Sequence, residues 1–161
     1  MLKIADFEFG KVITRSQRSI IMEAKNLKTN EQLTAKFYRI PDHKTKAYSY
    51  ILNEVVLMAK SNNHPNLVKF YGFCEKTMFD PALKEEYVGF YIILEKMEFS
   101  LKDEIKDRRA KKSFFTIEEI KVFLSGIFPA CIHLEGLNIA QQDLKTKNIL
   151  KKEKSYKVSY F

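Results

Sequence analysis

Apolar and polar residues alternate along the first part of the chain, and this period-two pattern predicts β-strands. We expect three strands, at residues 7–13, 19–26 and 32–40. The connection at 27–31 is polar and contains Asn30, which suits a hairpin turn. The chain is therefore expected to begin with a three-stranded antiparallel arrangement.

A helical period follows at residues 44–60, where Ile51, Val55 and Met58 recur at i, i+4 and i+7. Glu54 falls on the same face. A carboxylate among apolar side chains is costly unless a cation pairs with it. The pattern alone leaves two interpretations open: Glu54 has a cation nearby, or it lies at the helix edge and reaches water.

The breaker-rich segment 62–66 precedes two further predicted strands, at 67–74 and 87–95. Residues 76–86 are polar and contain Pro81, and we predict a loop there. The two cysteines, Cys74 and Cys131, are far apart in the sequence and are expected to be free, buried thiols.

The rest of the chain is predicted to be mainly helical. A basic helix is expected at 100–111, and a longer one after Thr116, which stands in capping-box spacing with Glu119. The apolar stripe of the longer helix is Ile117, Ile120, Leu124, Ile127 and Cys131, and Pro129 should kink or shorten it. A loop at 140–148 and a hairpin between 149–150 and 156–161 complete the prediction.

Composition and charge exclude several classes of protein. The chain has 161 residues, enough for one domain or two small lobes, and 45% of them are hydrophobic, which supports a real core. The net charge of +8 includes basic blocks at 106–112 and 145–157. We interpret these blocks as solvated surface, so nucleic acid binding is disfavoured. No apolar run is long enough to span a membrane, and the free cysteines favour a cytoplasmic location.

The clearest chemical signal is the segment 141–150, which reads Gln-Gln-Asp-Leu-Lys-Thr-Lys-Asn-Ile-Leu. Asp143, Lys145 and Asn148 stand in the spacing of the catalytic loop of protein kinases, and the sequence resembles that family. Upstream segments match in the same order. They are Leu33-Thr34-Ala35-Lys36, Glu54 on the following helix, the His-Pro-Asn-Leu-Val-Lys-Phe-Tyr-Gly segment at 64–72, and Ile-Ile-Leu-Glu-Lys-Met at 92–97.

The resemblance implies an α+β, protein-kinase-like fold. It consists of a five-stranded antiparallel N-lobe sheet with one long helix, followed by the first part of a helical C-lobe. Residues 1–161 would form one incomplete domain, with about 1–96 as the N-lobe and the start of the hinge, and 97–161 as the beginning of the C-lobe.

The resemblance also implies a role for each matching residue. Lys36 would hold the ATP phosphates and pair with Glu54. Asp143 would accept or orient the substrate hydroxyl, Lys145 would neutralise the γ-phosphate and favour serine/threonine substrates, and Asn148 would ligate magnesium. Adenine would be enclosed by a set of apolar and hinge positions, with Leu94 as gatekeeper. These positions are Ile13, Ile21, Thr34, Leu94, Glu95, Met97 and Leu150.

Several positions depart from the family pattern. Thr14, Ser16 and Ser19 replace the phosphate-loop glycines, so phosphate binding should weaken. Gln141 and Gln142 replace His and Arg, which puts the bracing of the catalytic loop in doubt. Tyr160 replaces the magnesium-binding Asp, and a phenol is a poor substitute for a carboxylate.

These matches and departures lead to two functional hypotheses. The first is a pseudokinase or kinase fragment with a degraded ATP and magnesium site, which acts by binding a protein partner such as a kinase or a scaffold. The alternative is an active serine/threonine protein kinase of which this chain is an incomplete product. In either case the stripe that begins at Ile117 should remain exposed or be covered by a partner.

Overall fold

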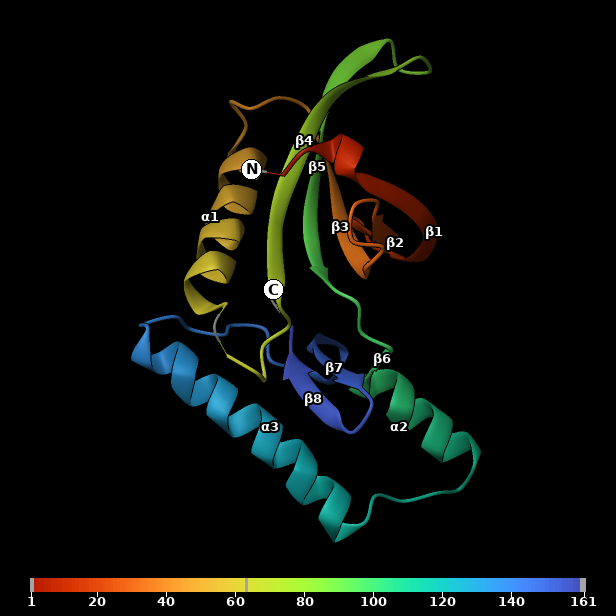
Figure 1. Ribbon diagram of the computed structural model, residues 1–161, viewed down its shortest axis with the longest axis vertical. Helices are drawn as coiled ribbons and strands as arrows, with labels where there is room; N and C mark the ends of the chain where they lie inside the picture. The colour runs from red at the N-terminus through yellow and green to blue at the C-terminus, as the bar shows by residue number, and fades with distance from the viewer. Residues whose placement is uncertain (1, 63, 160–161) are drawn as a thin grey trace. The chain divides into compact units, whose positions relative to one another are not determined.

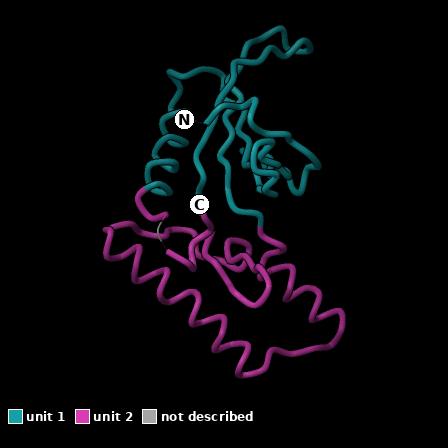
Figure 2. Tube along the Cα trace, viewed as in Figure 1, with its two compact units in different colours: residues 1–59, 70–96 teal, residues 60–69, 97–161 magenta. Residues whose placement is uncertain are grey.

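The computed structural model describes residues 2–62 and 64–159, which form two compact units (Figure 1). The first unit comprises residues 1–59 and 70–96, and the second comprises 60–69 and 97–161. Figure 2 shows the first unit in teal and the second in magenta.

The first unit is built on a five-stranded antiparallel sheet with strand order β1-β2-β3-β5-β4. A 3₁₀ turn, η1 (Ile4–Asp6), leads into it. The strands are β1 (Phe7–Arg15), β2 (Ile20–Asn26), β3 (Gln32–Ile40), β4 (Phe70–Asp80) and β5 (Glu85–Glu95). The predicted five-stranded sheet and the three-stranded start are confirmed.

Apolar side chains from several strands form the core on one face of this sheet. The buried cluster consists of Phe7, Ala24, Leu33, Ala35, Cys74, Tyr91 and Ile93. Leu33 and Ala35 alternate with Thr34 and Lys36 along β3, so the polar pair points to the opposite face. The candidate chemistry therefore lies on the face opposite this cluster, where Ile40, Phe90 and Ile92 are also buried.

Helix α1 (Lys46–Ser61) follows β3 and lies beside the sheet of the first unit (Figure 1). Ile51, Val55 and Met58 are all buried, which confirms the predicted apolar face. Each such side chain contributes about 1.5–3 kcal/mol when it leaves water. The helix is thus held to the sheet chiefly by apolar contacts, and the position of Glu54 is fixed with it.

The prediction of a loop at 76–86 was wrong, because β4 and β5 continue as a long hairpin. Their pairing runs out to Asp80 opposite Glu85. Asp80 Oδ1 accepts the amide hydrogens of Ala82 and Leu83, and Lys84 takes a positive φ of 55°. The prediction failed because it relied on the polar composition of this segment. The hairpin extends past the end of β3, where its side chains do not have to be apolar.

The prediction of a strand starting at residue 67 was also wrong, because β4 begins at Phe70. Leu67 and Val68 belong to the second unit and are buried there, with 2% and 1% exposed. The Val68 amide donates to the Val158 carbonyl at 3.0 Å, and the Val158 amide donates to the Asn66 carbonyl at 2.8 Å. Leu67 and Val68 are apolar because they are buried in the second unit beside Val158, which is distant in the sequence.

The second unit combines a small antiparallel sheet, of order β6-β7-β8, with two helices. The strands are β6 (Phe99–Ser100), β7 (Ile149–Lys152) and β8 (Ser155–Val158), and the helices are α2 (Leu101–Ala110) and α3 (Ile117–Gly136), with a 3₁₀ turn η2 (Thr146–Asn148). The predicted hairpin near the end of the chain is therefore present, and β6 adds a strand that was not predicted.

Both helices of the second unit begin with a capping box. Ser100 and Asp103 form one, and Thr116 and Glu119 form the other, as predicted for α3. Pro129 does not end α3, which continues to Gly136. Gly126 is required for close packing against β8, because a Cβ there would lie 2.8 Å from the Tyr156 carbonyl oxygen.

Much of the apolar stripe of α3 is exposed. Ile127 is buried, but Ile117 is 67% exposed, and Ile120 and Leu124 are exposed as well. Cys74 and Cys131 are free thiols; Cys74 is buried, whereas Cys131 is only half-buried, contrary to the prediction. Within residues 2–62 and 64–159, no helix has the length and apolar character needed to cross a membrane.

Candidate functional site

The first unit places Lys36 of β3 beside Glu54 of α1. Lys36 Nζ lies 2.7 Å from Glu54 Oε1, and the two side chains are 13% and 14% exposed. Tyr38, two residues further along β3, donates its hydroxyl hydrogen to Glu54 Oε2 at 2.8 Å. The cation that Glu54 requires is thus Lys36, as the resemblance implied, and the contact with Tyr38 was not predicted.

The predicted adenine positions of the first unit lie on β1, β2, β3 and β5. Thr34 pairs with Leu94 in the register of β3 and β5, and Ile21 pairs with Lys36 in that of β2 and β3. Leu94 is buried, whereas Ile13 is 54% exposed where the β1–β2 register shifts. The structure therefore brings Ile21, Thr34 and Leu94 near Lys36 and leaves Ile13 at the margin.

The remaining predicted adenine positions are divided between the units. Glu95 ends β5 in the first unit, and Met97 is the first residue of the 97–161 part of the second unit; both are half-buried. Leu150 is half-buried on β7 of the second unit. Their assignment to an adenine site stays a prediction.

The turn between β1 and β2, where the glycines of a phosphate loop would stand, is closed by serine side chains. Ser16 Oγ accepts the backbone amide hydrogens of Ser19 at 3.0 Å and of Arg18 at 3.3 Å. The Ser16 amide in turn donates to the Ser19 carbonyl at 2.9 Å. Three amide groups of this turn are therefore directed inward, whereas a phosphate-binding loop directs such groups toward its ligand.

The second unit brings together the three residues of the predicted catalytic loop. Asp143 Oδ2 lies 2.6 Å from Lys145 Nζ and accepts a hydrogen bond from Asn148 Nδ2 at 3.0 Å. Asn148 Nδ2 also donates to the Asp143 carbonyl at 2.9 Å. The hydrogen bond from Lys145, followed by that from Asn148, holds the pKa of Asp143 below its ordinary value, so this carboxyl is an acceptor at neutral pH.

Gln141 braces this loop through two hydrogen bonds. Its Oε1 accepts the Asp143 amide hydrogen at 2.6 Å, and its Nε2 donates to the Ser159 carbonyl at 3.3 Å. The Ser159 amide donates to the Asn148 carbonyl at 2.8 Å, which ties the same segment a second time. Gln141 thus braces the catalytic-loop segment, although the replacement of His by Gln had put this bracing in doubt.

The oxygen atoms that a magnesium ion would need are only partly present. Asn148 is the predicted contributor, and the nearby carboxylate oxygen Asp143 Oδ2 is already bonded to Lys145 and Asn148. Within residues 2–62 and 64–159, no group of three His, Cys, Asp or Glu side chains is arranged to hold a metal. Tyr160, which replaces the expected carboxylate, lies outside the described residues.

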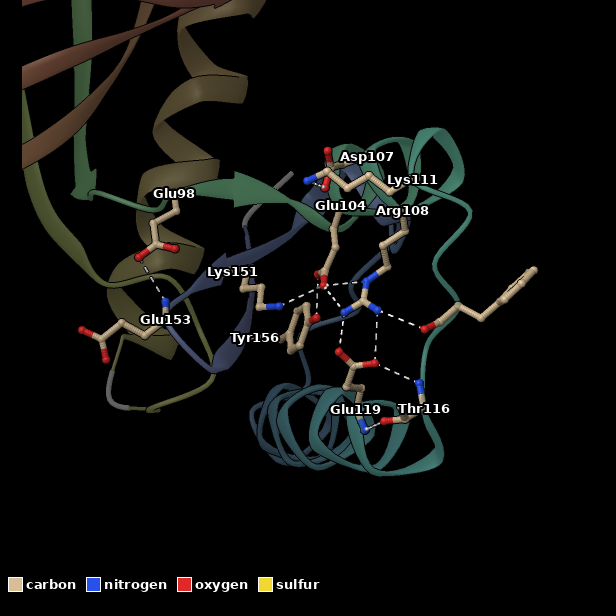
Figure 3. Close-up of polar contacts among 11 residues, drawn as sticks. Glu98, Glu104, Asp107, Arg108, Lys111, Thr116, Glu119, Lys151, Glu153 and Tyr156 are labelled. Carbon is tan, nitrogen blue, oxygen red and sulfur yellow. Dashed lines mark hydrogen bonds and ion pairs between the residues drawn. The ribbon is translucent and has the colours of Figure 1, made fainter.

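The second unit also contains a buried carboxylate, Glu104, that was not predicted (Figure 3). Glu104 of α2 is only 7% exposed. Its Oε1 accepts from Arg108 Nη2 at 3.0 Å and Lys151 Nζ at 2.9 Å, and its Oε2 accepts from the Tyr156 hydroxyl at 2.6 Å. Arg108 also pairs with Glu119 and donates to the Phe114 carbonyl. The signal was weak, because Lys151 and Tyr156 lie 47 and 52 residues from Glu104, although Arg108 is at i+4 on the same helix.

Glu104 lies at the edge of a cavity of about 590 Å³. The cavity is lined by Phe99, Asp103, Glu104, Asp107, Arg108, Lys111, Ser113 and Glu119. Burial opposes the charged form of Glu104, but the hydrogen bonds from Tyr156, Lys151 and Arg108 outweigh it and lower the pKa of this carboxyl. The arrangement is that of a satisfied structural ion cluster rather than of a reactive acid.

Comparison with known proteins gives a consistent result. Residues 7–161 match the protein kinase domain. The chain is 26% identical over 151 residues to a probable myosin light chain kinase of Dictyostelium discoideum, which covers 94% of this chain and 43% of that protein. It is 28% identical over 148 residues to myosin light chain kinase A of the same organism, covering 92% and 45%.

A plant kinase gives a similar match. Mitogen-activated protein kinase 11 of Oryza sativa subsp. japonica is 28% identical over 145 residues, which is 89% of this chain and 24% of that protein. The chain thus spans less than half the length of each of these three relatives.

Proposed function

The chain belongs to the protein kinase family, and from that premise we propose that it is a kinase-like domain that acts mainly by binding. In this proposal Lys36 holds the phosphates of ATP weakly, phosphoryl transfer is slow or absent, and the biological role is to bind a protein partner, a second kinase or a scaffold. The proposal keeps the family's nucleotide site but not its full chemistry.

The observation that carries this proposal is the closed serine turn at 16–19. Ser16 Oγ holds two of its amide hydrogens, and the Ser16 amide is bonded to Ser19. A phosphate would have to replace these bonds before it could use the same groups. Each exchange costs a net hydrogen bond of about 0.5–1.5 kcal/mol, so nucleotide affinity should be low.

The metal chemistry points the same way. Magnesium prefers charged oxygen ligands, and here it would depend on Asn148 and an Asp143 whose Oδ2 is already shared. When bound, the ion would neutralise charge on the transferred phosphoryl group. If the ligand replaced by Tyr160 normally contributes about 4 kcal/mol, its loss would slow transfer by roughly three decades.

The surface of α3 supports a partner-binding role. Ile117 and Ile132 are each 67% exposed and Phe128 is 59% exposed, all on one helix. Exposed apolar side chains, where they form a contiguous patch, are typical of protein interaction sites. In the proposal this surface is covered by an apolar face of the protein partner.

The nucleotide part of the proposal is tested by reopening the turn. The double substitution Ser16→Gly and Ser19→Gly should tighten ATP binding about 3- to 10-fold, because the freed amides can turn toward phosphate. The measurement is a thermal melt of the purified chain over a range of ATP concentrations, with and without magnesium.

The matched control is Ser155→Gly, which removes a serine hydroxyl that also closes an exposed turn, by donating to the Lys152 carbonyl at 3.1 Å. It should leave ATP affinity unchanged. A phosphotransfer rate in the unaltered chain that Asp143→Ala abolishes would contradict the proposal.

That result would favour the second candidate function, an active serine/threonine kinase of which this chain is a part. The contacts that favour it are the 2.6 Å approach of Asp143 and Lys145 and the 2.7 Å pair of Lys36 and Glu54. In that case magnesium should increase the ATP-dependent shift in melting temperature, and Asn148→Ala should remove this increase.

A further inference from the structure

Tyr38 on β3 contacts the oxygen of Glu54 that Lys36 does not hold. It is two residues beyond Lys36, so both side chains point to the same face of the sheet. Lys36 Nζ approaches Glu54 Oε1 at 2.7 Å, and the Tyr38 hydroxyl approaches Oε2 at 2.8 Å. Each carboxylate oxygen therefore has its own donor from the same strand.

The environment of Tyr38 keeps its hydroxyl a donor. The side chain is only 9% exposed. Burial first, and then the charge and hydrogen bond of Glu54, raise the pKa of the phenol far above its ordinary value. Lys36 Nζ also lies 5.1 Å from the centroid of the Tyr38 ring, a cation–π distance. Tyr38 thus contacts both members of the ion pair.

We propose that Tyr38 is a positioning residue of the nucleotide site, which fixes the Glu54 carboxylate so that Lys36 is held ready for phosphate. A carboxylate bound through one oxygen can rotate about its terminal torsion, and the lysine would move with it. With both oxygens held, Lys36 pays less conformational entropy when ATP binds. This inference rests on the proposed binding of ATP at Lys36.

A second tyrosine supplies a matched control. Tyr48 of α1 donates its hydroxyl hydrogen to Glu75 Oε2 at 3.1 Å, and His43 Nε2 lies 3.4 Å from the other oxygen of Glu75. Tyr48 therefore makes the same kind of bond between α1 and the sheet without touching Glu54. Tyr48→Phe removes one hydroxyl from the same helix attachment, as Tyr38→Phe does, but leaves the candidate site intact.

The first experiment measures ATP affinity by calorimetric titration. Tyr38→Phe should weaken ATP binding about 5-fold, the value of one hydrogen bond, and Tyr48→Phe should change it by less than about 2-fold. In a Glu54→Gln background, Tyr38→Phe should have little further effect, because the two residues act as a unit. Equal losses in Tyr38→Phe and Tyr48→Phe, or full additivity with Glu54→Gln, would overturn the proposal.

A second measurement separates this inference from the proposed function. Amide hydrogen exchange of the nucleotide-free chain should be faster at residues 51–58 of α1 in Tyr38→Phe, and faster near residues 46–50 in Tyr48→Phe. Unaltered exchange at 51–58 in Tyr38→Phe would overturn the positioning role. If the exchange difference is seen but the chain binds no ATP, Tyr38 still positions Glu54, and the proposed nucleotide function is disproved.

Discussion

Glu54 in the first unit and Glu104 in the second are each bound by a lysine and a tyrosine, yet the two carboxylates are arranged for different purposes. Glu54 receives Lys36 on one oxygen and Tyr38 on the other. Glu104 accepts hydrogen bonds from Lys151 and Tyr156, and from Arg108 in addition.

The difference lies in charge and exposure. The second cation of the Glu104 cluster, Arg108, is shared with Glu119, and the carboxylate is 7% exposed, against 14% for the side chain of Glu54. A buried carboxylate that accepts from a full set of donors stabilises the fold, and those donors are engaged with it. The same residue types mark a candidate site only where the lysine can also bind a ligand, as we propose for Lys36.

The largest expected effect tests the structural role of Glu104. Glu104→Ala would leave Arg108, Lys151 and Tyr156 without their shared acceptor, and the loss of one member of a buried ion cluster costs about 3–5 kcal/mol. Urea unfolding should show this loss of stability. The control is Asp107→Ala, whose exposed pair with Lys111 should be worth under about 1 kcal/mol. Equal effects of the two substitutions would remove the distinction between the clusters.

An intermediate effect is expected when the lysine of each carboxylate, Lys151 or Lys36, is replaced. Lys151→Met should cost about 1–2 kcal/mol of stability, since Arg108 and Tyr156 remain on Glu104. It should leave the shift in melting temperature caused by ATP unchanged, whereas Lys36→Met should abolish that shift. If Lys36→Met kept the shift, the site around Glu54 would be structural as well.

The smallest expected effect is a gradual dependence of the second unit's stability on pH. Glu119 has its pKa lowered from 4.5 to about 2, chiefly by its hydrogen bond with Arg108, and the pKa values of Asp103, Glu104 and Asp143 are lowered too. All four belong to the second unit. A lowered folded pKa gives stability that is present above the unfolded pKa and is lost as the pH falls through the folded value.

The second unit should therefore lose stability progressively between about pH 4.5 and 2. Urea unfolding at a series of pH values would measure this, and Glu119→Gln should flatten the curve. In the first unit Asp80 also has a lowered pKa, chiefly through its hydrogen bond with Arg39, so Asp80→Asn serves as the comparison. A larger flattening with Asp80→Asn than with Glu119→Gln would contradict the assignment.

Local sequence signals located most of the elements. The capping box of Thr116 and Glu119 marked the start of α3, and the spacing of Ile51, Val55 and Met58 marked the buried face of α1. The motif residues Asp143, Lys145 and Asn148 are close in sequence and also meet in space. These signals could be read because each depends on residues within a turn or two of one another.

Predictions failed where a residue is explained by a distant partner. Leu67 was assigned to the wrong strand, because its burial depends on a bridge to Val158. The polar hairpin tip at 76–86 was missed, since strand pairing there is decided by backbone hydrogen bonds rather than by an apolar face. Gln141 stands where the family has a histidine, and its bracing of the loop was in doubt, yet its side-chain amide donates to the Ser159 carbonyl.

The sequence by itself determined the family, the order of the elements and the residues that could pair with a phosphate, because these follow from short-range patterns and motif spacing. The pair of Lys36 with Glu54 was also expected, but only the tertiary structure decided which further donors satisfy the buried carboxylates. Glu104 finds Lys151 and Tyr156 across 47 and 52 residues, and Glu54 finds Tyr38 across 16. Side-chain donors at such separations are brought together only by folding, since hydrogen bonds form over about 3 Å whatever the distance along the chain.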